Sequence, residues 1–398
     1  MTLGPAASGF SSRLDWDLRP NRISAALEAK RREGAEILDL TESNPTRAGL
    51  AYPADEILTA LADPRSLAYE PLPAGSPEAR IAVSAYYAAR GEDVAPARIL
   101  LTASTSEAYA YVFKLLCNPG DEILVPRPSY PLFDFLARLE CVRAVQYPLI
   151  YHGGWRIDFD ALASLVTPRS RAIVLVNPNN PTGSFLKRDE LPRLLSLSAA
   201  SGLAIVSDEV FSDYTFAPCQ ERVRSLTGIE DVLTFCLSGL SKIAALPQMK
   251  LGWIVTGGPA DLHTRALERL ELIADTFLSA GTPVQRAAGR LIEAGATVRA
   301  QILSRVRQNL EFLREAVRNS PLGILDVEGG WYATVRVPRI RTEEEWTLEL
   351  LERAGVLVQP GFFFDFESEA FLVLSVLTEP ETFHEGVRRM LRHATMAK

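Results

Sequence analysis

The chain has 398 residues, 47% of them hydrophobic and 23% charged, so it can bury a large core in two or three domains. Its net charge of −7 argues against nucleic-acid binding through phosphate neutralisation. No apolar run is long enough to cross a bilayer, and the first residues lack the pattern of a secretory signal. We therefore expect a cytoplasmic protein. The cysteines and histidines form no ligand-type pairs, and no metal site is expected.

Short apolar runs alternate with helical patterns through the first two thirds of the chain. The predicted strands are 99–102, 123–126, 172–176, 203–207, 232–236 and 252–255, and the predicted helices are 107–117, 130–139, 159–165 and 189–200. Continuous apolar strands that alternate with helices favour a mostly parallel sheet covered on both faces. In such sheets ligands bind beyond the carboxyl ends of the strands.

From about residue 285 the pattern changes to α+β order. A long charged helix (283–319) precedes strand 331–337, helix 343–354, strands 356–359 and 371–376, and helix 381–394. We predict a large domain formed by residues 46–285. A smaller domain is predicted from residues 1–45 and 286–398.

Two turns after predicted strands carry hydroxyl and aromatic residues. Ser104, Thr105 and Ser106 open a predicted helix. Hydroxyls and free backbone N–H groups at a helix N-terminus suit a phosphate, although an ordinary N-cap explains the same residues. In Pro126-Arg-Pro-Ser-Tyr130-Pro131, prolines stiffen the turn. Tyr130 is a candidate to stack on a flat heterocycle, with an ordinary buried tyrosine as the alternative.

Three further turns carry an amide, a carboxylate and an amine. In Asn177-Pro-Asn-Asn180-Pro-Thr-Gly183, an asparagine next to proline can donate to a phenolate oxygen. Asp208 ends a predicted strand, where it needs a cationic partner such as a protonated pyridine nitrogen, unless it caps a helix. Lys242, in Ser238-Gly-Leu-Ser-Lys242, can form an imine with an aldehyde cofactor, and a surface charge is the alternative.

Together these segments resemble the class I/II aminotransferases, which are pyridoxal 5′-phosphate (PLP) enzymes of fold type I. The resemblance runs from Ile37-Leu-Asp-Leu-Thr-Glu-Ser-Asn44-Pro45 to the C-terminal helix, and the three motifs around Asn180, Asp208 and Lys242 occur in the family's order. It implies an aspartate-aminotransferase-like α/β fold. In that fold a large domain with a mostly parallel seven-stranded sheet covered by helices is joined to a smaller α+β domain.

The resemblance also implies roles for the cofactor residues. Lys242 would carry PLP as the internal aldimine and later move a proton, while Asp208 would pair with the pyridine nitrogen. Asn180 would donate to the ring O3′ oxygen, and Tyr130 would stack on the ring. The residues implied as phosphate ligands are Ser104, Thr105, Ser106, Ser238 and Lys250.

Two further positions bear on assembly and substrate. Tyr69 matches the tyrosine that reaches the phosphate of a neighbouring subunit, which implies a homodimer with shared active sites. Asn44 matches a position that lines the substrate pocket. The partners implied are a small-molecule amino donor and a keto-acid acceptor, with neither nucleic acid nor membrane.

Three positions depart from the family pattern. Lys250 stands where an arginine usually holds the phosphate, and Phe211 stands where a tyrosine donates to O3′. Val373 replaces the arginine that binds the substrate α-carboxylate. Either another cation takes over or the substrate is not an ordinary α-amino acid. Arg336 is the candidate cation, with a solvated strand-end arginine as the alternative.

The leading interpretation is a PLP-dependent aminotransferase that moves an amino group from a donor to a keto acid through Lys242. A PLP-dependent lyase, decarboxylase or cyclase on the same fold is the second interpretation, favoured by the loss of the arginine at Val373. A non-catalytic module with the PLP fold is the third. The presence of Asn180, Asp208 and Lys242 argues against it.

Overall fold

The computed structural model describes residues 9–217 and 219–396, so residues 1–8, which bear on the secretory-signal expectation, lie outside the described part. Within it, the largest sheet has eight strands. In spatial order they are β2 (Ile99–Thr102), β9 (Gly252–Gly257), β8 (Thr234–Gly239), β7 (Ala204–Asp208), β6 (Ser170–Val176), β3 (Glu122–Arg127), β4 (Arg143–Tyr151) and β5 (Trp155–Ile157). The run from β8 to β4 is parallel, whereas β2, β9 and β5 pair antiparallel to their neighbours. The short β5 adds an eighth strand to the seven expected.

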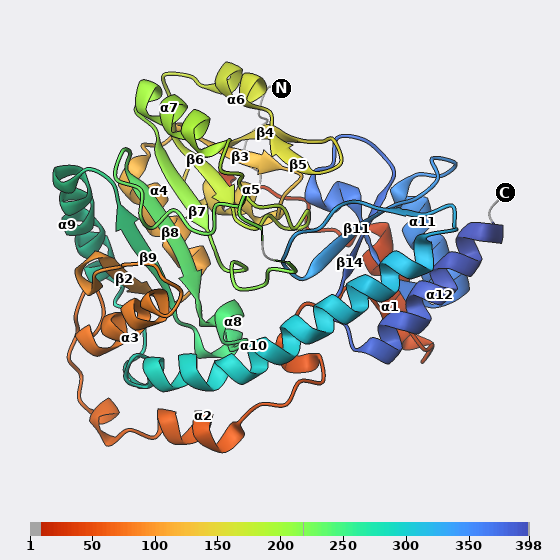
Figure 1. Ribbon diagram of the computed structural model, residues 1–398, viewed down its shortest axis with the longest axis horizontal. Helices are drawn as coiled ribbons and strands as arrows, with labels where there is room; N and C mark the ends of the chain where they lie inside the picture. Colours follow the sequence, from red (N-terminus) through yellow and green to blue (C-terminus); the bar gives the residue numbers. More distant parts are fainter. Residues whose placement is uncertain (1–8, 218, 397–398) are drawn as a thin grey trace.

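Helices cover both faces of this sheet (Figure 1). One face packs on α4 (Thr105–Leu116), α5 (Leu132–Leu139) and α9 (Ala260–Phe277). The other packs on α2 (Ala54–Leu61), α3 (Pro77–Ala88), α6 (Phe159–Leu165), α7 (Leu191–Ser201), the short α8 (Leu240–Ile243) and the first part of α10 (Thr282–Val317). Successive strand residues serve opposite faces, as Ile205 and Val206 do. The apolar runs of these strands follow from burial on both sides.

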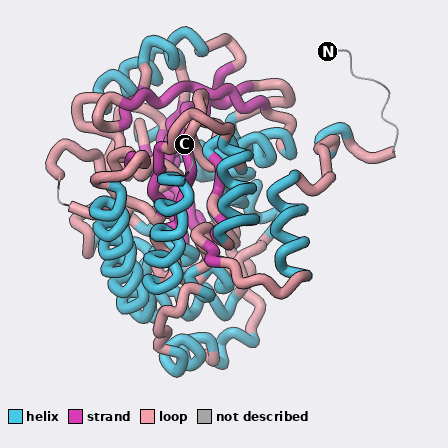
Figure 2. The backbone as a smooth tube through the Cα atoms, turned by 90° about the vertical axis from the view of Figure 1, so that its right-hand side faces the viewer, coloured by secondary structure: helices cyan, strands magenta, loops and turns pink. Residues whose placement is uncertain are grey.

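A second, four-stranded antiparallel sheet lies toward the C-terminus. Its order is β10 (Gly323–Ile324), β11 (Tyr332–Arg336), β14 (Phe371–Ser375) and β13 (Gln359–Pro360). Near it, β1 (Leu38–Asp39) pairs with β12 (Val356–Leu357), so the N-terminal segment returns to this part. The accompanying helices are α1 (Arg22–Arg32), α11 (Glu343–Glu349), which continues as a π-turn (Leu350–Ala354), and α12 (Pro380–Met396). From the side, helices stand in front of the strands (Figure 2).

Helix α10 connects the two sheets and runs diagonally across Figure 1. Its residues from Val284 to Ala294 pack in the core beneath the large sheet, and those from Val298 to Val317 pack with β11, β14 and α12. The domain boundary predicted at residues 285 and 286 falls near the start of this helix, and the division stays a prediction. No helix within the described residues contains an 18-residue window apolar enough to cross a membrane.

Candidate active site

A cavity lies beyond the carboxyl ends of the parallel strands. Its lining residues are Ser43, Thr105, Ser106, Tyr109, Tyr130, Leu132, Phe133, Leu136, Val176, Asn180, Asp208, Val210, Phe211, Ser241, Lys242 and Tyr332. Asp208 ends β7, and Lys242 follows β8 on α8. Seven of the site residues expected from sequence therefore meet in one place, namely Thr105, Ser106, Tyr130, Asn180, Asp208, Phe211 and Lys242.

Lys242 is a partly buried amine at an aromatic wall of this cavity. Its Nζ lies 4.6 Å from the ring centroid of Trp331 and 5.2 Å from that of Phe211. Burial lowers the pKa of Lys242 to about 8, although the nearby Asp208 carboxylate opposes the shift. Near neutral pH an appreciable fraction of this lysine is then the neutral amine that attacks carbonyl carbon.

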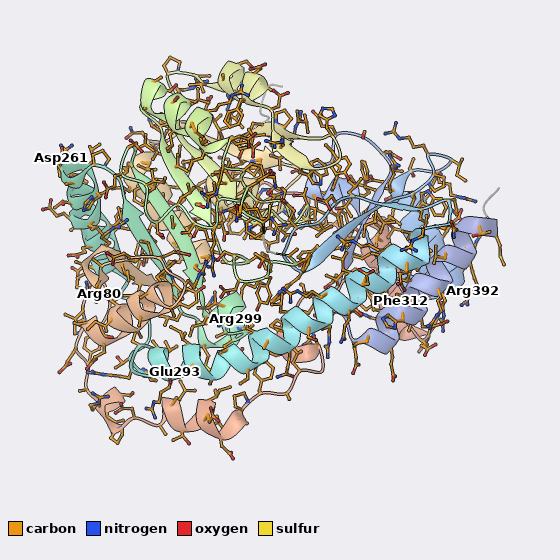
Figure 3. All side chains as sticks on the ribbon, in the orientation of Figure 1. Arg80, Asp261, Glu293, Arg299, Phe312 and Arg392 are labelled. Atoms are coloured by element: carbon orange, nitrogen blue, oxygen red, sulfur yellow. The ribbon has the colours of Figure 1, made fainter. Side chains whose placement is uncertain are left out.

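Three side chains hold the backbone around Lys242. The phenol of Tyr214 donates to the Lys242 carbonyl (2.6 Å), Arg299 donates to the Ile243 carbonyl (2.8 Å) and Tyr52 donates to the Ala245 carbonyl (2.9 Å). Arg299 projects from α10 toward α8 (Figure 3). Since α8 has only four residues, it would not be stable as a helix on its own, and these three bonds fix its position.

Asp208 is a partly buried carboxylate that accepts hydrogen bonds from Val210 and Tyr109. Burial raises the pKa of Asp208 to about 6, while the backbone N–H of Val210, the phenol of Tyr109 and the charge of Lys242 act against that shift. The Val210 N–H donates to Oδ1 at 3.2 Å, and the Tyr109 hydroxyl donates to Oδ2 at 3.1 Å. A protonated pyridine nitrogen would supply the cation that a carboxylate in such a site needs.

The three asparagines of the 177–183 loop have different surroundings. Asn177 donates to the Val223 carbonyl (2.9 Å), and Asn179 donates to the Pro128 carbonyl (2.9 Å) and accepts from the Ser129 hydroxyl (3.1 Å). These bonds join the loop to the turn that carries Tyr130. Asn180 lines the cavity, and its buried Oδ1 has no hydrogen-bond partner among the described residues. Since no described residue accepts a hydrogen bond from its Nδ2 either, that group is available to donate to a ligand oxygen.

Four of the five expected phosphate ligands, Ser104, Thr105, Ser106 and Ser238, lie at or beside the start of α4. A Cβ added to Gly252 would lie 3.0 Å from the Ser104 carbonyl carbon and 3.2 Å from the Ser238 carbonyl oxygen, so these segments meet closely. The Ser104 Oγ accepts from the Glu107 N–H and acts as the helix N-cap. The Ser238 Oγ is buried without a partner in the described part of the chain. Lys250 is exposed at the turn before β9.

This arrangement fits PLP. The cavity offers an amine for the aldehyde, a carboxylate for the ring nitrogen and an amide for the ring oxygen, in Lys242, Asp208 and Asn180. The N-terminus of α4, where Thr105 and Ser106 line the cavity, offers backbone N–H groups and hydroxyls for a phosphate.

Besides Ser104, Ser238 and Lys250, three other expected residues lie outside the cavity lining. Tyr69 is 76% exposed and lines a separate hollow. The Asn44 side chain accepts from Thr46 at a helix start, and its neighbour Ser43 lines the cavity instead. Arg336 is exposed at the far end of β11, four residues and roughly 13 Å of strand from the cavity residue Tyr332. The expectation that Arg336 replaces the lost carboxylate ligand is not supported, because four residues of extended chain separate it from the site.

Several cavity residues were not expected from the sequence. Helix α5 contributes Leu132, Phe133 and Leu136. Tyr109 lies on α4 four residues after Thr105, so helical spacing places both on the same face. That spacing was the available signal for Tyr109, whereas the cavity role of α5 depends on tertiary packing.

Comparison with known proteins agrees with this geometry. Residues 35–390 match the family described as aminotransferase class I and II. The glutamate-pyruvate aminotransferase AlaA of Escherichia coli K12 is 34% identical over 266 residues, 65% of either chain, so the match spans just under two thirds of that enzyme. The arginine–pyruvate transaminase AruH of Pseudomonas aeruginosa is 31% identical over 304 residues, 75% of each chain.

A solved structure of an aminotransferase from Escherichia coli superimposes with a TM-score of 0.84 at 26% identity, covering 97% of this chain and 98% of that one. The expected fold class, PLP fold type I of the aspartate-aminotransferase kind, is thereby confirmed. The family match covers most of the chain and includes the loops that form the cavity. The chain belongs to the class I and II aminotransferase family.

Proposed function

We propose that this protein is a PLP-dependent aminotransferase that moves an amino group from an amino donor to a keto acid through Lys242. The observation that carries the proposal is the meeting of Lys242, Asp208 and Asn180 in one cavity beyond the strand ends. These three side chains supply the amine, the carboxylate and the amide that the cofactor requires. Bound PLP supplies an electron sink that makes the α-proton of the amino donor acidic.

The protein side chains then have separate tasks. Lys242 Nζ takes the proton from the α-carbon of the donor and returns it during amine transfer, for which a pKa lowered to about 8 is suited. Asp208 accepts the N–H of the ring nitrogen, and Asn180 donates to the ring oxygen. Tyr130 covers the ring and limits the access of water. Because Phe211 has no hydroxyl, Asn180 is the assigned donor to that oxygen.

We propose a homodimer with shared sites as the working form. Tyr69, 76% exposed, lines a hollow with Leu72 and Leu278, which are 47% and 36% exposed. Leu67, 93% exposed, lies two residues away from Tyr69. An apolar surface of this kind suits burial against a second copy, which would bring Tyr69 to the partner's phosphate. Analytical ultracentrifugation tests the assembly, and Tyr69→Phe tests the shared site through its effect on PLP affinity.

We propose two domains, one formed by residues 46–285 and the other by residues 1–45 and 286–398.

We propose the cytoplasm as the location. In support, Cys141 and Cys219 are exposed free thiols, which persist in a reducing compartment. Cys236 is buried and Cys117 is half-buried.

The substrate is set by how its carboxylate is held. Val373 is fully buried in β14, paired with Thr334 and Gln359 on the flanking strands, and supplies no charge. Lys242 is the cation among the described lining residues. A substrate carboxylate therefore requires a cation from elsewhere, such as the second subunit, or the donor lacks an α-carboxylate. The relatives named for glutamate, arginine and pyruvate support the first of these.

A half-reaction screen tests the proposal. The PLP form is mixed with α-amino acids, ω-amino acids and simple amines, without keto acid, and the cofactor absorbance and products are followed. An aminotransferase yields pyridoxamine phosphate and a carbonyl product in equal amounts. Release of carbon dioxide or of an elimination product with PLP retained would identify a lyase or decarboxylase instead. Failure of the purified protein to bind PLP would support the non-catalytic module.

A further inference from the structure

Tyr109 is a buried cavity residue that contacts the proposed ring-nitrogen partner. It lies on α4 and is 4% exposed. Its hydroxyl donates to Asp208 Oδ2 at 3.1 Å, across 99 residues of sequence. The sequence motifs give it no role, because it lies one turn beyond the hydroxyl cluster at the helix start. The contact connects α4, whose N-terminus is the expected phosphate site, with the end of β7, which carries Asp208.

We propose that Tyr109 is a positioning residue, which orients Asp208 and keeps it charged so that it selects the protonated ring nitrogen of PLP. This inference rests on the proposed cofactor. It adds a residue that acts on the cofactor through another side chain.

The geometry supports a fixed, directional donor. The Tyr109 ring lies between Phe113 and Phe133, with centroid distances of 5.7 Å and 5.5 Å, and the contact with Phe133 is edge-to-face. Those two rings leave the phenol little freedom to turn away. Val210 N–H holds the other carboxylate oxygen, so each oxygen of Asp208 has one protein donor. The carboxylate plane is thus set before the cofactor binds, which reduces the cost of aligning it.

Two other titratable groups face Asp208, and neither is placed to orient its carboxylate as Tyr109 does. Lys242 on α8 attracts the carboxylate, while burial and then the charge of Asp208 raise the pKa of Tyr130, on the turn before α5. Lys242 is committed to the aldehyde carbon of the cofactor, and Tyr130 lies 45% exposed over the cavity. Among these groups, Tyr109 is the side chain whose hydrogen bond to Asp208 is made within the protein itself.

The test compares PLP with an analogue in which a C–H group replaces the ring nitrogen. The full-length protein is titrated with each, and the ratio of the two dissociation constants measures the contribution of the nitrogen. We expect Tyr109→Phe to reduce the preference for PLP by about tenfold, the effect of one hydrogen bond to a charged acceptor. In an Asp208→Asn background, Tyr109→Phe should have no further effect on the ratio.

Tyr147→Phe is the matched control. Tyr147 is also fully buried, and its hydroxyl donates to the Val174 carbonyl at 2.8 Å, within the sheet core opposite α4. Its loss lowers the unfolding temperature and leaves the preference ratio unchanged. The role is overturned if Tyr109→Phe retains the wild-type ratio while folding normally. A wild-type protein that binds neither compound would contradict the proposed function itself, so the two failures are distinguishable.

Discussion

The phenol of Tyr214 donates a 2.6 Å hydrogen bond to the carbonyl oxygen of Lys242. Tyr214 lies six residues after Asp208, so the segment that follows the ring-nitrogen partner also holds the reactive lysine. Beside it, Asp213 pairs with Arg299 at 3.5 Å, and Arg299 donates to the next carbonyl of α8. The positions of Asp208 and Lys242 are therefore coupled through protein atoms, before any cofactor contact is made.

Removing the Tyr214 hydroxyl should weaken this coupling. Tyr214→Phe removes the side-chain donor to the Lys242 carbonyl, which keeps the Ala245 N–H at 3.2 Å, at a cost of roughly 0.5 to 1.5 kcal/mol of unfolding free energy. We also expect a lower rate of the half-reaction, because the amine is less well placed. Chemical denaturation and stopped-flow absorbance measure the two effects. Tyr52→Phe, which removes a 2.9 Å bond to the Ala245 carbonyl, should cost similar stability with a smaller loss of rate.

The asparagine loop predicts a separation of stability from cofactor binding. Asn179→Ala removes two donated bonds and one accepted bond, so it should lower the unfolding free energy by about 2 kcal/mol or more. Asn180→Ala should leave the stability of the cofactor-free protein nearly unchanged and weaken PLP binding. Denaturant titration and PLP titration of both variants check this. Equal destabilisation by both substitutions would contradict the assignment.

Glu209 predicts a stability that depends on pH near neutrality. Burial raises the pKa of Glu209 to about 7, although Ser225 and Leu226 donate to its carboxylate. In the unfolded chain the group titrates near its ordinary value of 4.5. The folded state then binds the proton more tightly, so stability is lost as pH rises from about 4.5 to about 7. Glu209→Gln should remove roughly 3 kcal/mol of this dependence, at 1.36 kcal/mol per pKa unit.

Glu122 is the control of opposite sign. It is also buried, but the hydroxyl of Thr167 and the guanidinium groups of Arg169 and Arg143 outweigh the cost of burial and lower its pKa. Its contribution is present above the unfolded pKa and is lost as pH falls. Glu122→Gln should therefore reduce stability at neutral pH. Thermal unfolding of both variants between pH 4 and pH 8 separates the two cases, and parallel curves would refute the distinction.

The position of Arg336 predicts a substitution without effect on catalysis. Its side chain lies at the exposed end of β11, away from Tyr332 and the cavity. Arg336→Ala should change the KM for an active donor by less than about twofold, as is usual for surface substitutions. Steady-state kinetics with the best donor from the screen provide the check. A tenfold rise in KM with unchanged kcat would restore Arg336 as a substrate ligand.

The site residues at the strand ends, Asp208 and Lys242, could be predicted because the sequence patterns that mark them are local. Asp208 and Lys242 directly follow apolar strands, and parallel strands present their carboxyl ends at one edge. Asn180 could be singled out as part of a proline-rich string, but its availability depends on Asn177 and Asn179 forming bonds elsewhere. Those bonds reach the Tyr130 turn and Val223, which the local sequence does not specify.

Other features depend on packing between distant segments. β4 was missed because Pro148 interrupts its pattern and most of its residues are only partly buried. The position of Arg336 could not be predicted, because strand membership does not tell which end of the strand faces the cavity. Tyr332, at the other end of the same strand, is the residue that reaches it.

The role of Lys242 is tested by identifying which lysine carries the cofactor. The chain has six lysines, and in the described part Lys30, Lys114 and Lys187 form ion pairs while Lys250 is exposed; the sixth, Lys398, lies outside the described residues. Borohydride reduction of the PLP-bound protein, followed by peptide mass spectrometry, would locate the modified residue. We expect modification at Lys242, which is lost in Lys242→Ala. Modification of another lysine, or of none while PLP stays bound, would contradict it.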